Sequence, residues 1–166
     1  MRFNSLPSPS LCQAFACVPS ELGFSSAGFR VIVHGWEREL KAELRDEVFL
    51  IGREAIVNAC RHSRATDIEM EVEYRPTELG IVVSDNGCGI DPHQLRWGGN
   101  EHGGLCGMRE RAEKIGARLR LRSRARAGTE VELFVPNPIA FQLRSSQRLL
   151  GWLAGIDLRR RPCAIQ

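Results

Sequence analysis

Apolar residues recur at helical spacing in one long stretch of the chain, from Leu40 to Ser63. This stretch contains no proline and a single glycine, Gly52. The apolar positions that recur about once per turn are Val48, Ile51, Ala55 and Ala59. A stripe with a period near 3.6 residues is typical of a helix that packs one face on a core. The pattern predicts one long amphipathic helix over residues 40–63.

Strands are predicted where the apolar period shortens to two residues. Between Asp67 and Tyr74, acidic residues alternate with apolar ones, which predicts a strand with one face toward solvent. Further strands are expected at residues 29–33, 79–84, 117–122 and 129–135, with a helix at residues 108–115 that stops at Gly116. Five glycines in residues 96–107 predict a flexible loop, and Asp91-Pro92 before it is typical of a helix start.

Paired strands with helices between them favour an α+β fold, a two-layer α/β sandwich whose mixed sheet is covered on one face by helices. The 166 residues suit one domain with flanking segments. We expect residues 1–27 to be weakly structured, with one short helix near residues 11–18. The domain is expected at residues 28–136, followed by a tail at 137–166 with one helix near 139–154.

Composition narrows the class of protein further. Hydrophobic residues make up 43% and charged residues 26% of the chain, as in ordinary globular proteins. The net charge of +3 comes from the tail, whose five arginines and one aspartate give +4, while residues 1–136 carry −1. We interpret it as a solvated tail and expect no direct nucleic-acid partner. No apolar run reaches the roughly 18 residues of a membrane span. The six cysteines form no metal-binding pattern, so reduced thiols and a cytoplasmic location are expected.

Three polar residues form a line on the long predicted helix. Glu54, Asn58 and His62 are spaced four residues apart, so they share one face. Carboxylate and carboxamide oxygens are hard donors that suit Mg²⁺. A polar stripe that faces solvent is the alternative interpretation.

Glycine-rich segments supply the other candidate chemistry. Asp85-Asn86-Gly87-Cys88-Gly89-Ile90 follows a predicted buried strand and is compatible with either a ligand pocket or a simple turn. The glycines before residue 108 could offer backbone N–H groups to an anion, or form a loop without a ligand. Thr129, after Gly128, could contact a ligand or cap the backbone.

These segments occur in one order over about eighty residues, and here the chain resembles a known family. Residues 53–65, 85–90, 104–112 and 128–133 are similar to four motifs of the ATP-binding catalytic domain of sensor histidine kinases. That domain belongs to a superfamily shared with gyrase, heat-shock chaperones and mismatch-repair ATPases. The resemblance covers residues 29–135. Its arginine-histidine pair, Arg61-His62, is similar to the sensor kinases that work with helix-turn-helix response regulators.

The resemblance implies a role for each matching residue. Asn58 would coordinate Mg²⁺, Glu54 would support the metal or polarise the transfer, and Arg61 and His62 would line the phosphates. Asp85 would accept a hydrogen bond from the adenine amine.

The remaining implied ATP contacts lie in the glycine-rich segments. Residues 96–107 would form a lid over ATP, with Gly104 and Gly107 as its phosphate-side hinge. The other implied ATP contacts are Gly87, Gly89, Ile90, His102, Leu105, Met108 and Thr129.

Two departures from the family pattern affect the expected activity. Glu101 occupies a place before His102 where the family usually has glycine, and its charge could repel a triphosphate. All four histidines fall within residues 34–102, inside the expected ATP-binding region. The phosphoacceptor histidine is therefore expected on a separate domain or chain, with a response regulator as an indirect partner and the chain itself a monomer. The alternatives are a nucleotide-binding remnant without transfer, or a single-domain serine kinase of the anti-sigma type.

Overall fold

The computed structural model describes residues 10–24, 28–90 and 103–141. Its helices are α1 (Leu11–Glu21), α2 (Ala42–His62), α4 (Gly103–Lys114) and α5 (Asn137–Ala140). Its strands are β1 (Phe29–His34), β2 (Ile68–Tyr74), β3 (Glu78–Asp85), β4 (Arg118–Ser123) and β5 (Thr129–Pro136). No helix in the described ranges is long and apolar enough to span a bilayer.

The strands form one five-stranded sheet in the order β1-β2-β3-β5-β4. β1 runs parallel to β2, and the other neighbouring pairs are antiparallel. α2 is the crossover between the two parallel strands, as a parallel pair requires. The predicted mixed sheet and α+β class are confirmed.

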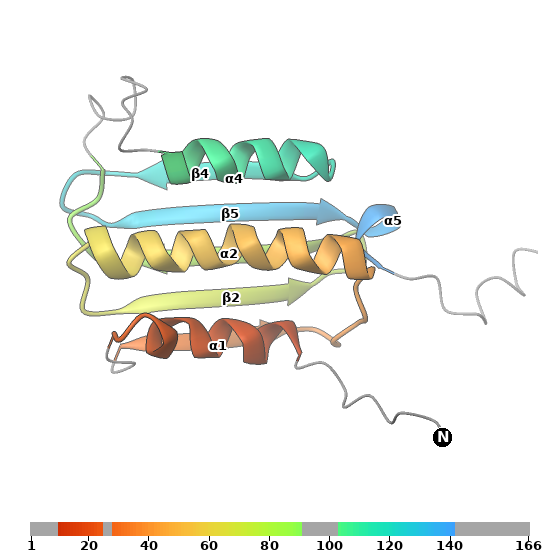
Figure 1. Cartoon of the computed structure of the whole chain (residues 1–166), viewed down its shortest axis with the longest axis horizontal. Helices are drawn as coiled ribbons and strands as arrows, with labels where there is room; N and C mark the ends of the chain where they lie inside the picture. The colour runs from red at the N-terminus through yellow and green to blue at the C-terminus, as the bar shows by residue number, and fades with distance from the viewer. Residues whose placement is uncertain (1–9, 25–27, 91–102, 142–166) are drawn as a thin grey trace, which may run out of the picture.

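Helices α1, α2 and α4 cover the same face of the sheet (Figure 1). The core lies between the two layers. Ile51 and Ile56 of α2 pack there with Met70, Val72 and Ile81 of the sheet, all at most 2% exposed. The amphipathic helix predicted over residues 40–63 is confirmed to within two residues at its start.

The other face of the sheet carries mostly charged side chains. On β2, Glu69, Glu71 and Glu73 alternate with the buried residues Met70 and Val72, which confirms the predicted strand with one polar face. Arginines of the neighbouring edge strands neutralise much of this charge, in pairs such as Arg30–Glu69 and Arg118–Glu78.

The short helix predicted near residues 11–18 is confirmed and is three residues longer, but it is well packed, which was not expected of the N-terminal segment. This helix is α1, which starts with a capping box between Ser10 and Gln13. Phe15 of α1 is fully buried and stacks on Phe49 of α2 at a centroid distance of 5.5 Å. Gly52 makes room for this ring, because a Cβ there would lie 2.5 Å from Phe15 Cε1. The helix is therefore part of the core.

The tail also starts later than expected. α5 covers only Asn137–Ala140, and Ala140 is fully buried. Phe141 forms an isolated bridge with Leu40, and Arg38 stacks on its ring at 3.6 Å from the centroid. The packed structure thus extends to residue 141, and most of the helix expected near 139–154 lies outside the described residues.

The glycine-rich loop predicted over residues 96–107 is wrong at its end, because α4 begins at Gly103. Helical structure therefore includes Gly104 and Gly107 and starts five residues before the predicted Met108. Asp91-Pro92 and residues 91–102 lie outside the described part of the chain, so the predicted helix start and the rest of the lid stay predictions.

Candidate functional site

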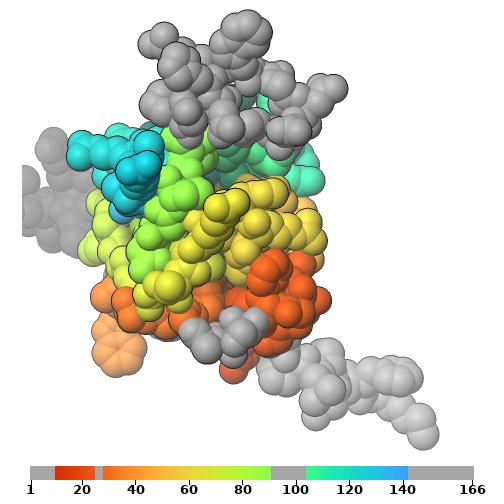
Figure 2. Space-filling model, turned by 90° about the vertical axis from the view of Figure 1, so that its left-hand side faces the viewer, coloured from red at the N-terminus to blue at the C-terminus, as the bar shows by residue number. Residues whose placement is uncertain are grey.

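A cavity of about 650 Å³ opens at the end of the molecule where α2 and β3 both finish. Figure 2 looks onto this end, where the yellow end of α2, the lime residues after β3 and the cyan turn between β4 and β5 lie side by side. A volume of this size suits a small-molecule ligand. The predicted site residues that line the cavity are Asn58, His62, Asp85, Gly89, Ile90, Gly104, Leu105 and Thr129.

The sheet places Asp85 and Thr129 together, since they are directly paired across β3 and β5. The half-buried Asp85 carboxylate accepts hydrogen bonds from the backbone N–H groups of Gly87, at 2.8 Å, and Thr129. Burial raises the pKa of Asp85 above its usual range, and these two hydrogen bonds only partly oppose the shift. A carboxylate in this setting gains from a further donor, such as a ligand amine.

Ser123 of β4 connects the segments around Asp85. Its hydroxyl accepts from Ile90 N at 2.7 Å and lies 3.0 Å from Thr129 Oγ1. Gly128 has φ +83°, and a Cβ there would lie 1.9 Å from Asp85 O. The glycine therefore allows the β4–β5 turn to contact the end of β3 closely.

The start of α4 lies on the polar stripe of α2. A Cβ at Gly104 would lie 2.1 Å from Glu54 Oε1 and 3.4 Å from Asn58 Nδ2. Gly104 thus lets the α4 backbone approach both side chains. Glu47, nearer the start of α2, binds the far end of α4 through Arg111 at 3.0 Å and Lys114 at 2.6 Å.

Several predicted site residues lie elsewhere. Arg61, Gly87 and Gly107 do not line the cavity, and neither does Glu54 despite its approach to Gly104. Met108 is 1% exposed and packs in the core. His102 lies outside the described residues.

Sequence reasoning missed part of the cavity wall. The missed residues are Ala55, Ala59, Ser63, Val83, Cys88, Leu121 and Val131. The two-residue period of the strands could have identified two of these residues. Val83 lies two residues before Asp85 and Val131 two residues after Thr129, so each shares a sheet face with a predicted site residue. This part of the wall is mainly apolar, which suits a flat heterocycle.

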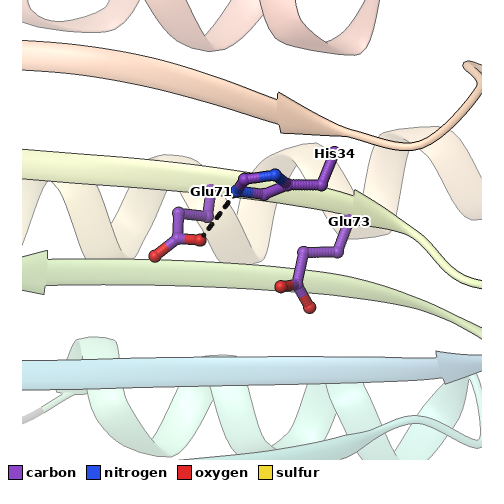
Figure 3. A group of neighbouring side chains, drawn as sticks. All are labelled: His34, Glu71 and Glu73. Carbon is purple, nitrogen blue, oxygen red and sulfur yellow. Dashed lines mark hydrogen bonds and ion pairs between the residues drawn. The ribbon is translucent and has the colours of Figure 1, made fainter.

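A separate polar cluster lies on the face of the sheet opposite α1, α2 and α4, where the side chains of His34, Glu71 and Glu73 converge (Figure 3). Their possible ligand atoms lie within 4.8 Å of one another, and His34 Nε2 is 3.2 Å from Glu71 Oε2. Arg75 already pairs with the Glu73 carboxylate. None of these residues lines the cavity, so the cluster belongs to the charged network on the face of the sheet opposite the helices.

The fold and the order of the motifs are those of one class of ATP-binding domain, and comparison with known families identifies that class. Residues 43–139 match the family described as histidine kinase-, DNA gyrase B- and HSP90-like ATPase, and the chain belongs to this family. The resemblance inferred from the four motifs is confirmed.

Within the family, the chain is similar to sensor histidine kinases. It is 37% identical over 87 residues to the nitrate/nitrite sensor protein NarX of Escherichia coli K12, covering 52% of this chain and 14% of that protein. It is 35% identical over 106 residues to the sensor protein VraS of Staphylococcus saprophyticus, covering 63% of this chain and 30% of VraS. The chain therefore matches less than a third of either relative.

Solved structures show the same fold. A blue-light activated histidine kinase of Erythrobacter litoralis superposes with a TM-score of 0.58 at 22% identity, over 74% of this chain and 39% of that one. A solved chain of the mycobacterial sensor histidine kinase MprB gives a TM-score of 0.56 at 18% identity, over 80% of this chain and 93% of that chain.

Proposed function

We propose that the cavity binds Mg²⁺-ATP and that the domain transfers the γ-phosphoryl group to a histidine on a separate domain or chain, as a step in two-component signalling. The observation that carries this proposal is the position of Asp85. Its carboxylate lies in a cavity with one apolar wall, and Asn58 and His62 at the end of α2 line the same cavity. The sensor kinases that share 35–37% identity with the chain favour histidine over serine as the acceptor.

The base would lie against the apolar wall, with its exocyclic amine donating to Asp85. Val83, Leu121 and Val131 offer the apolar contact. Thr129 adds a hydroxyl whose partner is Ser123, so it is held in place beside Asp85. A half-buried carboxylate that accepts from an amine favours adenine, because guanine carries an oxygen at the corresponding position.

The donor set on α2 fits a magnesium ion. Glu54 Oε1 and Asn58 Nδ2 both lie near Gly104 at the start of α4. The carboxylate and the carboxamide each carry oxygen of the kind that Mg²⁺ prefers. A bound ion would neutralise phosphate charge during transfer. His62 lines the cavity one turn beyond Asn58, where it can contact the phosphates, and Arg61 supplies a positive charge nearby.

Calorimetric titration with ADP and ATP, with and without Mg²⁺, tests the binding step. We expect binding that Mg²⁺ strengthens, and a loss of more than tenfold in affinity for Asp85→Asn, because a hydrogen bond to a charged group contributes about 1.5–3 kcal/mol. Asn58→Ala should abolish the dependence on Mg²⁺. An unchanged affinity in Asp85→Asn would refute the adenine assignment, and unchanged Mg²⁺ dependence in Asn58→Ala would refute the metal role.

Phosphotransfer distinguishes the proposed kinase from its alternatives. Radiolabelled ATP should label a histidine-containing acceptor domain supplied in trans. The label should be acid-labile, as phosphohistidine is. An acid-stable label on a protein serine would favour the serine kinase, and tight ATP binding without any label would favour a nucleotide-binding remnant.

A further inference from the structure

Asn86 directs its whole side chain away from the cavity, onto the loop that joins α2 to β2. Its Oδ1 accepts from the backbone N–H groups of Thr66 and Asp67, both at 3.1 Å. Its Nδ2 donates to Thr66 Oγ1 at 3.0 Å and to Asp67 Oδ2 at 2.9 Å. A carboxamide has two acceptor and two donor positions, so all four are used on two adjacent residues.

A second connection ties the same segment to the end of α2. Cys88 N donates to Ser63 O at 2.7 Å. Ser63 is 6% exposed, and its hydroxyl donates to Ala59 O at 2.6 Å and accepts from Ala65 N at 3.0 Å. A Cβ at Gly87 would lie 2.1 Å from Ser63 O, so glycine is required for this close contact.

The two connections fix the backbone on either side of Gly87. That residue donates its N–H to the Asp85 carboxylate at 2.8 Å. Without the four side-chain bonds of Asn86, the bond from its backbone N–H to Asp67 O, at 3.3 Å, and the Cys88–Ser63 bond would still hold this segment to the loop. The Gly87 N–H would then be held less firmly, and the carboxylate, which keeps its bond from Thr129, could turn from its position. An error of about 1 Å in a recognition group is enough to weaken binding strongly.

Resting on the proposed function, we propose that Asn86 is a positioning residue for base recognition. It contacts no nucleotide, and it acts by holding the 85–88 segment against the α2–β2 loop so that Asp85 faces the amine of the bound base. Its effect is specific to the base half of the ligand. Selectivity for adenine over guanine therefore depends on Asn86, whereas the contacts to the phosphates do not depend on it.

The test compares ADP and GDP affinities, by calorimetry, for the full chain and its variants. We expect Asn86→Ala to lose about tenfold or more in ADP affinity with little change for GDP, so that selectivity falls. Asn137→Ala is the matched control. That asparagine also fastens a turn, because its side chain donates to Pro76 O at the opposite end of β3. Its loss should leave selectivity unchanged.

A rescue variant separates positioning from general loss of stability. Asn86→Asp should lose selectivity for ADP over GDP. The new carboxylate would face the Asp67 carboxylate, whose Oδ2 now accepts a hydrogen bond from Asn86, and the two charges would repel each other. Adding Asp67→Asn reverses the direction of that hydrogen bond, and the Thr66 hydroxyl, which now donates to Asp67, can turn to donate to position 86. The double variant should recover most of the lost ADP affinity.

The outcomes separate the two proposals. If the wild-type chain does not favour ADP over GDP, both the proposed function and the role of Asn86 are overturned. If the wild type is selective and Asn86→Ala keeps that selectivity, only the role of Asn86 is overturned. An equal loss of selectivity in Asn137→Ala, or no recovery in the double variant, would likewise refute positioning in favour of a general structural effect.

Discussion

Two glycines of α4 provide a matched pair of perturbations that differ only in what surrounds them. Gly104→Ala would place a Cβ 2.1 Å from Glu54 Oε1 and 3.4 Å from Asn58 Nδ2. Gly107→Ala, one turn later, would meet no atom within 4 Å among the described residues beyond its own helix backbone. Both substitutions favour the helix by up to about 1 kcal/mol. Any difference between the variants therefore reports on the contact between α4 and the polar stripe of α2.

The expected magnitudes differ between stability and binding. The Glu54 carboxylate ends a flexible side chain, so it can move away from a new methyl group at small cost. We expect both variants to unfold within about 1 kcal/mol of wild type, with Gly107→Ala the more stable. Displacement of the Glu54 carboxylate should reduce Mg²⁺-ATP affinity in Gly104→Ala by about tenfold, since tenfold corresponds to about 1.4 kcal/mol. Gly107→Ala should bind as wild type does.

Urea denaturation and calorimetric titration measure the two quantities separately. A double-mutant cycle with Glu54→Ala provides the internal control, because removing the carboxylate removes the steric conflict. In that background Gly104→Ala should have no further effect on affinity. The reasoning is refuted if Gly104→Ala binds Mg²⁺-ATP as tightly as Gly107→Ala, or if its effect persists without the Glu54 carboxylate.

Three further predictions concern stability. Phe15→Ala should cost about 3–5 kcal/mol in urea unfolding, because its ring is fully buried; a change below about 1 kcal/mol would mean that α1 is dispensable. Hydrogen bonds from Lys114 and Arg111 lower the pKa of Glu47, so its stabilisation is present above the unfolded pKa and is lost as pH falls through the lowered value. Glu47→Gln should therefore cost about 0.2–1 kcal/mol at pH 7 and little at pH 3 or in high salt; a pH-independent cost would contradict this account. Burial raises the pKa of Asp85, so its contribution declines as pH rises through the raised value, and Asp85→Asn should gain thermal stability relative to wild type between about pH 3 and 7. A relative stability that falls over this range would contradict it.

Apolar periods of two and 3.6 residues predicted the strands and α2 well. Burial of one face requires an apolar residue at every second position of a strand and at every third or fourth position of a helix. The strand over residues 67–74 differs from β2 by one residue at its start. The periodicity did not predict that Asp85 and Thr129 are neighbours. Their proximity follows from the pairing of β3 with β5, which is a property of the whole sheet and not of either segment.

The start of α4 was mispredicted, and the burial of α1 was not foreseen, each for an identifiable physical reason. Glycine content favoured a loop at the start of α4, but packing of Gly104 against Glu54 and Asn58 outweighs the poor helix propensity of glycine there. α1 carries a weak apolar pattern, although Ser10 and Gln13 form a capping box that the spacing alone could have indicated. Its burial depends on Gly52, more than thirty residues away, which no local pattern reveals.

The pairing of β3 directly with β5 has a consequence for how such a domain can diversify. The two strands are neighbours in the sheet, yet the whole of residues 86–128 connects them. Closing a longer connection is cheap, since doubling its length costs only about 0.6 kcal/mol. Insertions and deletions within this excursion can therefore reshape one side of the cavity while the central strand pair, and the Asp85–Thr129 register that it sets, stay unchanged. The architecture separates a part of the chain that can vary in length from a part that cannot.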